Sequence, residues 1–393
     1  MLFPTFQFAA FFAGVFLLSW QLVALPRLWR YFLLFAGVVF YGAWDPSFLP
    51  LLMGLAAANH LAGTRLARRP SRAILILAIS FNLAVLAGFK YIGFICSNLN
   101  VVLSCLHVEG RVPLYQAQLP LGLSFVVFQA ISYVVDVYRG KLASCSYSRL
   151  VMYLTFFPHV VAGPIVRASE FLPQIETPPD PRRIEAGRAF WLIQCGMFKK
   201  VVLASYLAST AVDPVFAVPS AYAYLDRLVA LYAYTLQIYF DFSGYTDIAI
   251  GVALLLGIRF PPNFDSPYRS ASIQEFWRRW HITLSRWLRD FLYIPLGGSK
   301  GGNLNTYRNL MLTMLLGGLW HGANWTFVIW GFLHGLALAI ERWLESRRTF
   351  VGDRFRLPAH AVRTVLTFHV VCLCWVFFRA ESLGIAMEFF ERT

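Results

Sequence analysis

The stretch at residues 306–343, TYRNLMLTMLLGGLWHGANWTFVIWGFLHGLALAIERW, decides the fold of this chain. It consists of two apolar runs, 306–322 and 324–343, joined by one residue. A bilayer core about 30 Å thick needs roughly 20 apolar residues in a helix, so each run is close to the length that crosses a membrane. The stretch therefore predicts a transmembrane helical hairpin. It also places His321, with three glycines within four residues of it, at the end of the first run.

The composition extends this prediction to the whole chain. Of its 393 residues, 58% are hydrophobic and only 14% are charged, and the mean hydropathy is +0.58. A soluble domain carries about 25% charged residues, and this chain has no long polar block that would fold as a separate soluble domain. We expect an all-α polytopic membrane protein with about ten or eleven transmembrane or re-entrant helices. Residues 1–393 are expected to form a single membrane-embedded domain.

Other apolar runs mark the remaining spans. Hydropathy predicts them at 5–25, 31–43, 47–63, 73–95, 119–138, 187–210, 223–239, 242–258 and 361–379. The second and third are short segments hinged at Asp45 and Pro46. Residues 151–166 are apolar but are interrupted by two prolines and a glycine. Because irregular backbone at membrane depth needs protein or a water-filled cavity around it, this segment is predicted to be re-entrant.

The net charge of +14 arises mainly from basic residues in short loops. In a soluble protein this excess would suggest nucleic-acid binding, but in a membrane protein it is the positive-inside pattern, so no nucleic-acid partner is expected. From an outside N-terminus, alternating spans place the basic loops at 27–30, 64–72 and 138–149 on the cytoplasmic side. Residues 1–26 contain no Lys or Arg, so we expect no cleaved signal peptide.

Residues 273–298, IQEFWRRWHITLSRWLRDFLYIPLGG, predict one amphipathic helix at the membrane boundary. At the helical period, one face holds Gln274, Trp277, His281, Leu284, Ser285, Leu288 and Leu292. The flank and back hold Arg278, Arg279, Arg286 and Arg289. The pattern predicts that His281 points inward and that the arginines face headgroups or cytosol.

His321 and His281 are the candidates for catalysis. An ionisable group at membrane depth is costly and functional by default, and a neutral imidazole at His321 is able to accept a proton as a general base. The alternative for His321 is an imidazole bonded to a neighbouring backbone carbonyl, and for His281 a boundary residue that reaches the headgroups. No acid stands beside His321 and no H-E-x-x-H sequence occurs, so neither a serine-type hydrolase nor a metal site is expected.

Other polar residues lie in apolar runs. We interpret His159, His334, His360 and His369 as packing residues. Asp241 and Asp247 have two interpretations, a proton or ion path and hydrogen bonding between helices.

Four segments resemble the membrane-bound O-acyltransferase family. They are GPIVRASEFLPQI (163–175), YFDFSGYTDIAIGVALLLGIRFPPNFDSPYRSASIQEFWRRWHITLSRWLRDFLYIPLGGSKGG (239–302), LLGGLWHGANWTFVIWGFLHG (315–335) and CWVFFRAESL (374–383). The resemblance extends over about residues 1–385. It is nearest to the bacterial alginate O-acetyltransferase proteins, with the D-alanyl transfer protein of teichoic acid synthesis more distant. Members of this branch continue past the last segment with further spans, so the C-terminal spans typical of the family are expected to be missing here.

The resemblance implies helices around a central tunnel, with His321 as the catalytic histidine and His281 as the second signature position. It implies an O-acyltransferase of the EC 2.3.1 class in the bacterial inner membrane, multi-pass, with a periplasmic N-terminus. The donor is expected to be acetyl-CoA or another acyl thioester in the cytoplasm, with no bound cofactor and no metal. The acceptor is expected to be a hydroxyl of an exopolysaccharide such as alginate, or a periplasmic partner.

The expected partners are the lipid bilayer and periplasmic acetyltransferase or acceptor proteins of a polysaccharide-modification complex. The candidate substrate-binding residues are Trp277, Arg278, Arg279, Asn324, Asp241 and Lys300. Of these, Arg278, Arg279 and Lys300 either attract the phosphates of the donor or anchor the chain at the membrane surface. Two other functions stay open, a proton-coupled transporter that uses intramembrane His and Asp residues, and a scaffold that only recruits periplasmic partners.

Overall fold

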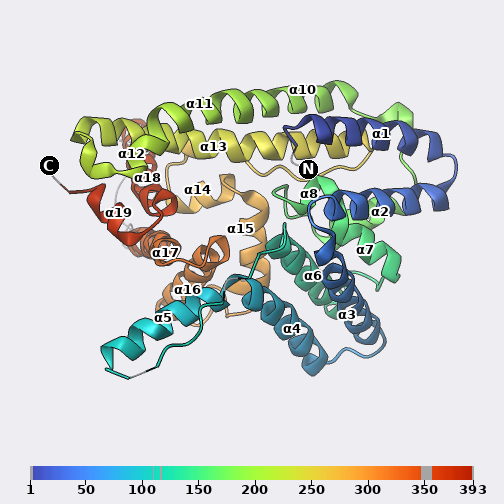
Figure 1. Ribbon diagram of the computed structural model, residues 1–393, viewed down its shortest axis with the longest axis horizontal. Coiled ribbons are helices and arrows are strands. Elements are labelled where there is room, and N and C mark those ends of the chain that lie inside the picture. The colour runs from blue at the N-terminus through green and yellow to red at the C-terminus, as the bar shows by residue number, and fades with distance from the viewer. Residues whose placement is uncertain (1–2, 109, 116, 347–355, 392–393) are drawn as a thin grey trace. The chain divides into compact units, whose positions relative to one another are not determined.

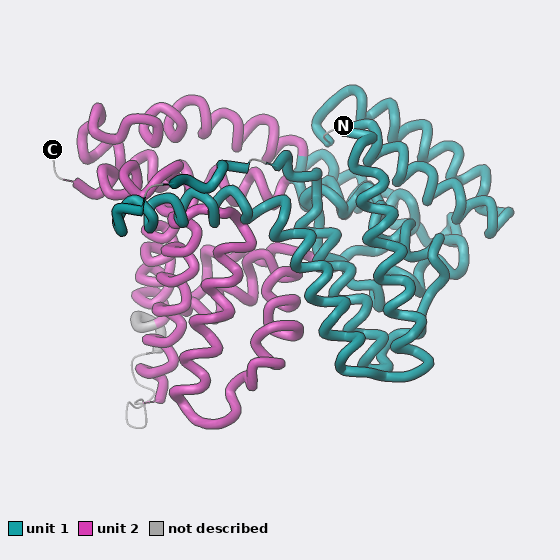
Figure 2. Tube along the Cα trace, turned by 60° about the horizontal axis from the view of Figure 1, so that its bottom comes forward, with its two compact units in different colours: residues 1–196, 245–261 teal, residues 197–244, 262–393 magenta. Residues whose placement is uncertain are grey.

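The computed structural model describes residues 3–346, apart from 109 and 116, and residues 356–391. Across these residues the backbone forms helices and loops and no strand, which confirms the predicted all-α class. The helices group into two compact units, residues 1–196 with 245–261 (unit 1) and residues 197–244 with 262–393 (unit 2), shown in Figure 2. Each unit thus combines two separate stretches of the chain. The single membrane-embedded domain stays a prediction.

Unit 1 contains the helices of the N-terminal half (Figure 1). They are α1 (Phe6–Leu22), α2 (Pro26–Gly42), α3 (Leu49–Arg68), α4 (Arg72–Lys90), α5 (Ile92–Cys105), α6 (Leu123–Tyr138), α7 (Tyr147–Thr155), α8 (Phe157–Val160), α9 (Ala168–Phe171) and all but the last residue of α10 (Ala186–Met197). Short 3₁₀ turns lie at Pro46–Phe48, Leu172–Ile175 and Pro181–Arg183.

Local signals explain where several of these helices begin. The Thr5 hydroxyl accepts a hydrogen bond from the Phe8 amide at 3.2 Å and caps α1, and Pro26 occupies the first position of α2. The hinge predicted at Asp45 is confirmed, because its carboxylate accepts a hydrogen bond from the Ser47 amide at 2.9 Å and caps the 3₁₀ turn before α3. In the core of unit 1, α6 is buried along most of its length, and its polar residues Gln129, Ser132 and Asp136 are buried with its apolar ones.

Unit 2 contains most of the C-terminal half (Figure 1). Its elements are π-helical Phe198–Ala204, α11 (Ser205–Leu207), π-helical Ala208–Val212, α12 (Asp213–Ala217), the 3₁₀ turns Pro219–Ala221 and Pro267–Arg269, α14 (Ile273–Arg279), α15 (Ile282–Leu288), π-helical Arg289–Tyr293, α16 (Asn303–His321), α17 (Trp325–Ser346), α18 (Arg356–Arg379) and α19 (Leu383–Glu388). The long helix α13 (Tyr224–Leu255) begins in unit 2 and ends in unit 1.

The helical hairpin is confirmed as α16 and α17, which pack together through glycines. Of the two helices, α17 is long and apolar enough to cross a membrane, and the membrane crossing of α16 stays a prediction. A Cβ atom on Gly318 would overlap the Phe327 carbonyl oxygen, and one on Gly331 would overlap the Met314 carbonyl oxygen. Small residues allow such backbones to approach closely in a membrane. The glycines around His321 therefore bring the two helices of the hairpin into contact.

Five helical segments of the described chain are long and apolar enough to cross a membrane. They are Arg72–Lys90, Ala186–Ala217, Tyr224–Leu255, Trp325–Ser346 and His360–Arg379. Three shorter apolar helices accompany them, Phe6–Leu22, Ile92–Cys105 and Leu123–Tyr138. The chain is an all-α polytopic membrane protein.

The predicted boundary between spans 223–239 and 242–258 is wrong, because α13 covers both in one helix (Figure 1). Phe240 and Asp241 lie at the expected break, and neither is a proline or glycine that would end a helix. The charge of Asp241 is paired with Lys200, whose Nζ lies 2.6 Å from Oδ1. With a rise of about 1.5 Å per residue, α13 is roughly 48 Å long, well beyond the thickness of a bilayer core.

Three other boundaries differ from the prediction. The run 73–95 is divided at Tyr91 into α4 and α5. The run 187–210 continues to Ala217 through the two π-helical segments, and the second span begins at Pro26 rather than at residue 31.

The interruption predicted within 151–166 is confirmed, since Phe156 is extended between α7 and α8 and the backbone after α8 is not helical. The re-entrant course of this segment stays a prediction.

Candidate active site

The single amphipathic helix predicted over 273–298 is wrong, because the chain turns sharply at His281. Helix α14 ends at Arg279, α15 begins at Ile282, and His281 between them has φ +42° and ψ 54°. This left-handed conformation is uncommon for residues other than glycine and costs roughly 1–2 kcal/mol. Such strained positions cluster at functional sites.

Asn263, in the loop after α13, holds this turn in place. Its carbonyl oxygen accepts a hydrogen bond from the Ile282 amide at 3.0 Å. Its side-chain Oδ1 accepts from both the amide and the hydroxyl of Thr283, at 3.1 and 2.9 Å. Asn263 is 1% exposed, so these bonds are sheltered from water. The sequence reasoning did not identify Asn263, because its role depends on a contact between residues 20 apart.

The turn places the His281 imidazole in the interior of unit 2. The side chain is 1% exposed, its ring lies 4.6 Å from the Phe242 ring edge-on, and neither ring nitrogen has a hydrogen-bond partner among the described residues. Burial, together with the nearby His321, lowers the pKa of His281 well below its usual value of about 6.5. His281 is therefore a neutral imidazole with both nitrogens available to a polar group of a substrate.

His321 is the last residue of α16, directly before the hairpin turn at Gly322. Aromatic rings surround its imidazole, with centroids at 5.0 Å for Trp320, 5.2 Å for Trp330 and 5.1 Å for Phe378. The side chain is only partly buried. His321 thus combines an apolar setting with access from outside the packed core.

The structure brings the two predicted histidines together. The ring centroids of His281 and His321 are 6.4 Å apart, although 40 residues separate them in sequence. The Trp320 ring lies beside both, 6.1 Å from His281 and 5.0 Å from His321. One sealed imidazole and one accessible imidazole in an aromatic setting are suited to proton transfer and to polarising a carbonyl group.

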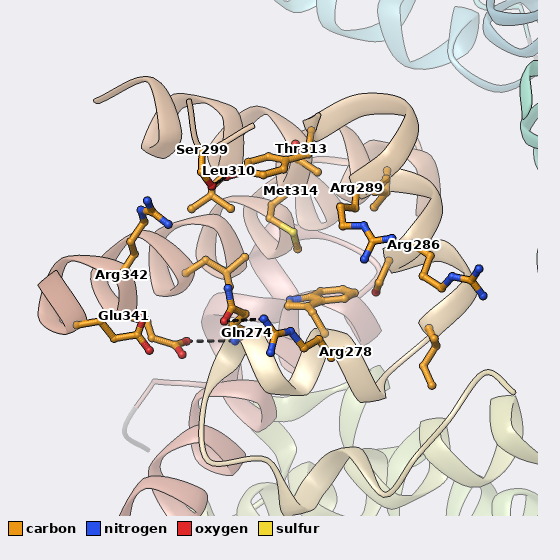
Figure 3. A pocket seen from close by; sticks show the side chains of 17 residues that line it. Gln274, Arg278, Arg286, Arg289, Ser299, Leu310, Thr313, Met314, Glu341 and Arg342 are labelled. Carbon is orange, nitrogen blue, oxygen red and sulfur yellow. Dashed lines mark hydrogen bonds between the residues drawn. The ribbon is translucent and has the colours of Figure 1, made fainter. Parts of the chain in front are cut away.

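A cavity of about 490 Å³ lies in unit 2 (Figure 3). It is lined by Gln274, Trp277, Arg278, Ile282, Ser285, Arg286, Leu288, Arg289, Tyr293, Ser299, Leu310, Thr313, Met314, Leu338, Glu341, Arg342 and Glu345. Four of these are arginines and two are glutamates, so the lining has a net charge of 4 − 2 = +2. Its volume is within the range of small-molecule sites, and its charge favours an anionic ligand.

Two indole rings, those of Trp277 and Trp330, lie between this cavity and His321. Trp277 lines the cavity, and its ring lies 5.7 Å from that of Trp330. Trp330 in turn contacts His321. Neither His281 nor His321 lines the cavity itself. The cavity and the histidine pair are therefore neighbouring parts of unit 2, separated by aromatic side chains.

Glu341 of α17 holds the first turn of α14. Its Oε2 accepts a hydrogen bond from the amide of Ile273 at 2.8 Å and one from the amide of Gln274 at 3.2 Å, the second of which is drawn in Figure 3. A carboxylate at a helix N-terminus satisfies amides that have no partner within the helix. Arg342, Glu341 and Glu345 were not among the predicted site residues, because only packing of α17 against α14 reveals them.

Some of the predicted binding residues line the cavity and others do not. Trp277 and Arg278 line the cavity. Arg279 does not, since its guanidinium pairs with Glu275 at 2.9 Å and Asp265 at 3.6 Å.

Three more predicted residues lie outside the cavity lining. Asp241 forms its ion pair with Lys200, and Lys300 is exposed beside the lining residue Ser299. Asn324 has a structural role, because its Oδ1 accepts from the Thr326 amide at 3.1 Å at the start of α17.

His334 is a third histidine close to this region. It is fully buried, with its ring 4.8 Å from Trp330 and 5.1 Å from Trp277, and neither ring nitrogen has a hydrogen-bond partner in the described part of the chain. The Trp330 ring contacts both His334 and His321. These contacts are consistent with the packing role expected for His334.

Comparison with known proteins gives consistent matches. A sequence model of the membrane-bound O-acyltransferase family matches residues 132–378. The chain is 41% identical over 391 residues to a probable alginate O-acetylase AlgI of Pseudomonas putida, covering 98% of this chain and 78% of that protein. It is 37% identical to a peptidoglycan O-acetyltransferase of Helicobacter pylori, covering 92% and 72%. It is 31% identical to a teichoic acid D-alanyltransferase of Streptococcus thermophilus, covering 66% and 68%.

Proposed function

The chain belongs to the membrane-bound O-acyltransferase family, and from this premise we propose that it transfers an acetyl group from a cytoplasmic thioester to a hydroxyl acceptor outside the inner membrane. The acceptor is a hydroxyl of an exported polysaccharide such as alginate, or a periplasmic partner protein that acetylates it. The names of two relatives, an alginate O-acetylase and a peptidoglycan O-acetyltransferase, support acetyl as the transferred group. The donor is acetyl-CoA or another acyl thioester.

The observation that carries the proposal is the pairing of His281 and His321, with ring centroids 6.4 Å apart. In the proposed reaction, the neutral His321 imidazole removes the proton from the acceptor hydroxyl. The oxygen attacks the thioester carbonyl carbon, the new C–O bond forms, and the C–S bond breaks. The imidazolium then returns its proton to the leaving thiolate. General-base catalysis of this kind contributes about 10²–10⁴ in rate.

His281 acts on the acyl group rather than on the acceptor. With no hydrogen-bond partner for either nitrogen among the described residues, it is free to donate a hydrogen bond to the thioester carbonyl oxygen. Negative charge develops on that oxygen during attack, and a donor in a dry setting stabilises it more than water does. This assignment separates the two histidines into a base and a polarising group.

The arginine-lined cavity supports a phosphate-bearing donor such as acetyl-CoA. Arg278 and Arg342 contribute positive charge from different helices, α14 and α17. Guanidinium groups bind phosphates through paired hydrogen bonds. The basic loops at 27–30, 64–72 and 138–149 support a cytoplasmic donor side and a periplasmic N-terminus through the positive-inside rule.

Replacing His321 tests the base role directly. We expect His321→Ala to lower O-acetylation of the exported polymer by at least about 10²-fold, because no other group takes the acceptor proton. The acetyl content of purified polymer is the measurement, with an immunoblot of membranes to show that the variant accumulates. His360→Ala is the matched control, because its side chain is exposed and it is expected to leave acetylation unchanged. Wild-type acetyl content in His321→Ala would overturn the proposed base.

A labelled donor separates acyl transfer from transport and from scaffolding. Purified protein with acetyl-labelled acetyl-CoA and a polysaccharide acceptor should release free CoA and place the label on the acceptor. A proton-coupled transporter would release no CoA. A scaffold would leave acetylation unaffected when either histidine is replaced.

A further inference from the structure

Unit 1 contains a second charged cavity, between the start of α2 and the start of α7. Its volume is about 220 Å³, and Arg27, Arg30 and Arg149 are three of the residues that line it. Figure 1 shows α2 and α7 side by side in this part of the chain. The three guanidinium groups come from two helices, so the tertiary fold gathers charges that the sequence places 119 to 122 residues apart.

The positive charge of this cavity is only partly compensated. Glu176 is the one carboxylate that pairs with these arginines among the described residues, through Arg149 at 3.5 Å, and both side chains are substantially exposed. Arg30 donates instead to the backbone carbonyl of Glu176 at 2.9 Å. Arg27 has no hydrogen bond or ion pair in the described structure. Three cations facing one carboxylate leave capacity for an anion that guanidinium groups bind well, such as a phosphate.

Hydroxyl groups complete the polar side of the cavity. Ser146 and Ser148 line it, and their hydroxyls form a hydrogen bond to each other at 3.3 Å. Ser146 precedes the first turn of α7 but makes no capping hydrogen bond to the helix amides. One of the two hydroxyls donates to the other, so the second is available to donate to the same anion as the arginines.

An exposed apolar stripe begins at the cavity and follows α2. Leu28, Tyr31, Phe35 and Val39 are spaced by three or four residues, so they share one helix face, and they are 50%, 61%, 63% and 37% exposed. Tyr31 belongs to both features, since it also lines the cavity. A ligand that fills both must be anionic at one end and apolar along the rest.

We propose that this cavity binds the phosphodiester headgroup of an anionic membrane phospholipid, with one acyl chain lying along the α2 stripe. Basic pockets at the membrane boundary select anionic headgroups, and the stripe distinguishes a lipid from a free phosphate. Arg27 and Arg149 contact the phosphate, and Phe35 contacts the chain. The proposal concerns unit 1 alone and does not depend on the acyl-transfer chemistry.

Lipid binding to the purified full-length chain tests the site. The protein in detergent is titrated with phosphatidylglycerol and, separately, with phosphatidylcholine, and bound lipid is counted by native mass spectrometry. We expect at least about tenfold preference for phosphatidylglycerol. We expect Arg27→Gln with Arg149→Gln to lower its affinity about tenfold, and Arg27→Gln alone to lower it by a smaller factor. Arg27 is exposed and unpaired, so the single variant keeps the fold.

A matched variant removes the same charge elsewhere. Arg68→Gln with Arg69→Gln takes two exposed arginines from the next basic loop and should change the affinity less than about twofold. Equal loss in this control, or unchanged affinity in the Arg27/Arg149 variant, would overturn the site.

Two further arms test the nature of the ligand. Phe35→Ser should weaken phosphatidylglycerol binding, and an unchanged affinity would refute the chain position. Displacement of the lipid by equimolar glycerol 3-phosphate would show a free-phosphate site instead.

Discussion

His281 combines a left-handed backbone with a fully buried imidazole. Each feature alone opposes folding, because the backbone is strained and the ring nitrogens lose water without gaining a partner among the described residues. Asn263 fixes the backbone through three hydrogen bonds from Ile282 and Thr283, the two residues that follow His281. The fold therefore maintains an unfavourable residue at a fixed point 6.4 Å from His321, as expected for a side chain with a chemical task.

The buried neutral state of His281 predicts a loss of stability in acid. Burial lowers the pKa of His281 in the folded chain, so below about pH 6.5 the unfolded chain binds a proton that the folded chain does not. Unfolding therefore becomes easier as the pH falls below about 6.5. The melting temperature of the purified protein, measured at pH 7.5 and pH 5, should show the effect.

His281→Asn is the variant that isolates this contribution. Asparagine tolerates the left-handed backbone, so the variant should fold, and it carries no proton in this range. We expect a smaller drop in melting temperature between pH 7.5 and pH 5 than in the wild type. An identical drop in both proteins would show that the pKa of His281 is the same in the folded and unfolded chains, against its assignment as a buried imidazole that stays neutral in acid.

Single residues were the part of the site most open to sequence reasoning. His321 was predicted from its place in an apolar run, and His281 from its place on the inward face of an amphipathic pattern and from the family resemblance. The binding set was less accessible, because Arg278 and Arg279 are adjacent in sequence yet only Arg278 faces the cavity. One residue along a helix is a rotation of about 100° about its axis. This rotation points Arg278 to the cavity and Arg279 to the carboxylate of Glu275.

At the scale of elements, the α16–α17 hairpin depends on glycines that contact backbone rather than side chains. Gly331 faces the Met314 carbonyl oxygen and Gly318 faces that of Phe327. The same two helices carry His321 and Trp330, whose rings are 5.2 Å apart. The spacing of the helices thus sets the position of the His321 imidazole, the proposed base, relative to its aromatic surroundings.

Adding one methyl group to this contact should weaken the hairpin. In Gly331→Ala the new Cβ overlaps the Met314 carbonyl oxygen, so the helices must move apart, at a cost of about 1–3 kcal/mol. We expect a lower melting temperature and reduced polymer acetylation. Gly54→Ala in α3 is the control, because no atom lies within 4 Å of its added Cβ and alanine is the better helix former. Equal behaviour of the two variants would contradict the role of the glycine contact.

Element starts were predicted well where a local signal coincides with the start of an apolar run. The spans predicted from residues 5 and 47 begin close to the caps at Thr5 and Asp45, whereas the span predicted from residue 31 begins at Pro26. The break at His281 has no such signal, since the amphipathic pattern continues through it and the turn is imposed by Asn263 from another segment. Conversely, α13 continues through Asp241 because Lys200 compensates the charge. Both errors arise from contacts between segments.

At the scale of the whole molecule, each compact unit is built from two stretches that are not consecutive in the chain. Unit 1 is completed by residues 245–261, which come after the first segment of unit 2. Within unit 1, Gly251 packs closely against the Ala189 backbone of α10. The Leu255 carbonyl accepts from the Trp20 indole at 3.1 Å.

This arrangement predicts how truncated chains behave. A fragment of residues 1–196 lacks the segment that contacts α1 and α10, and it also loses the two hydrogen bonds between Gln174 and Arg259, at 2.8 and 3.0 Å. A fragment of residues 1–261 retains both hydrogen bonds and the contact with α10. We expect the longer fragment to accumulate in membranes at several times the level of the shorter one, measured by immunoblot of the same N-terminal tag. Equal accumulation would mean that residues 245–261 contribute little to the stability of unit 1, and that residues 1–196 fold without them.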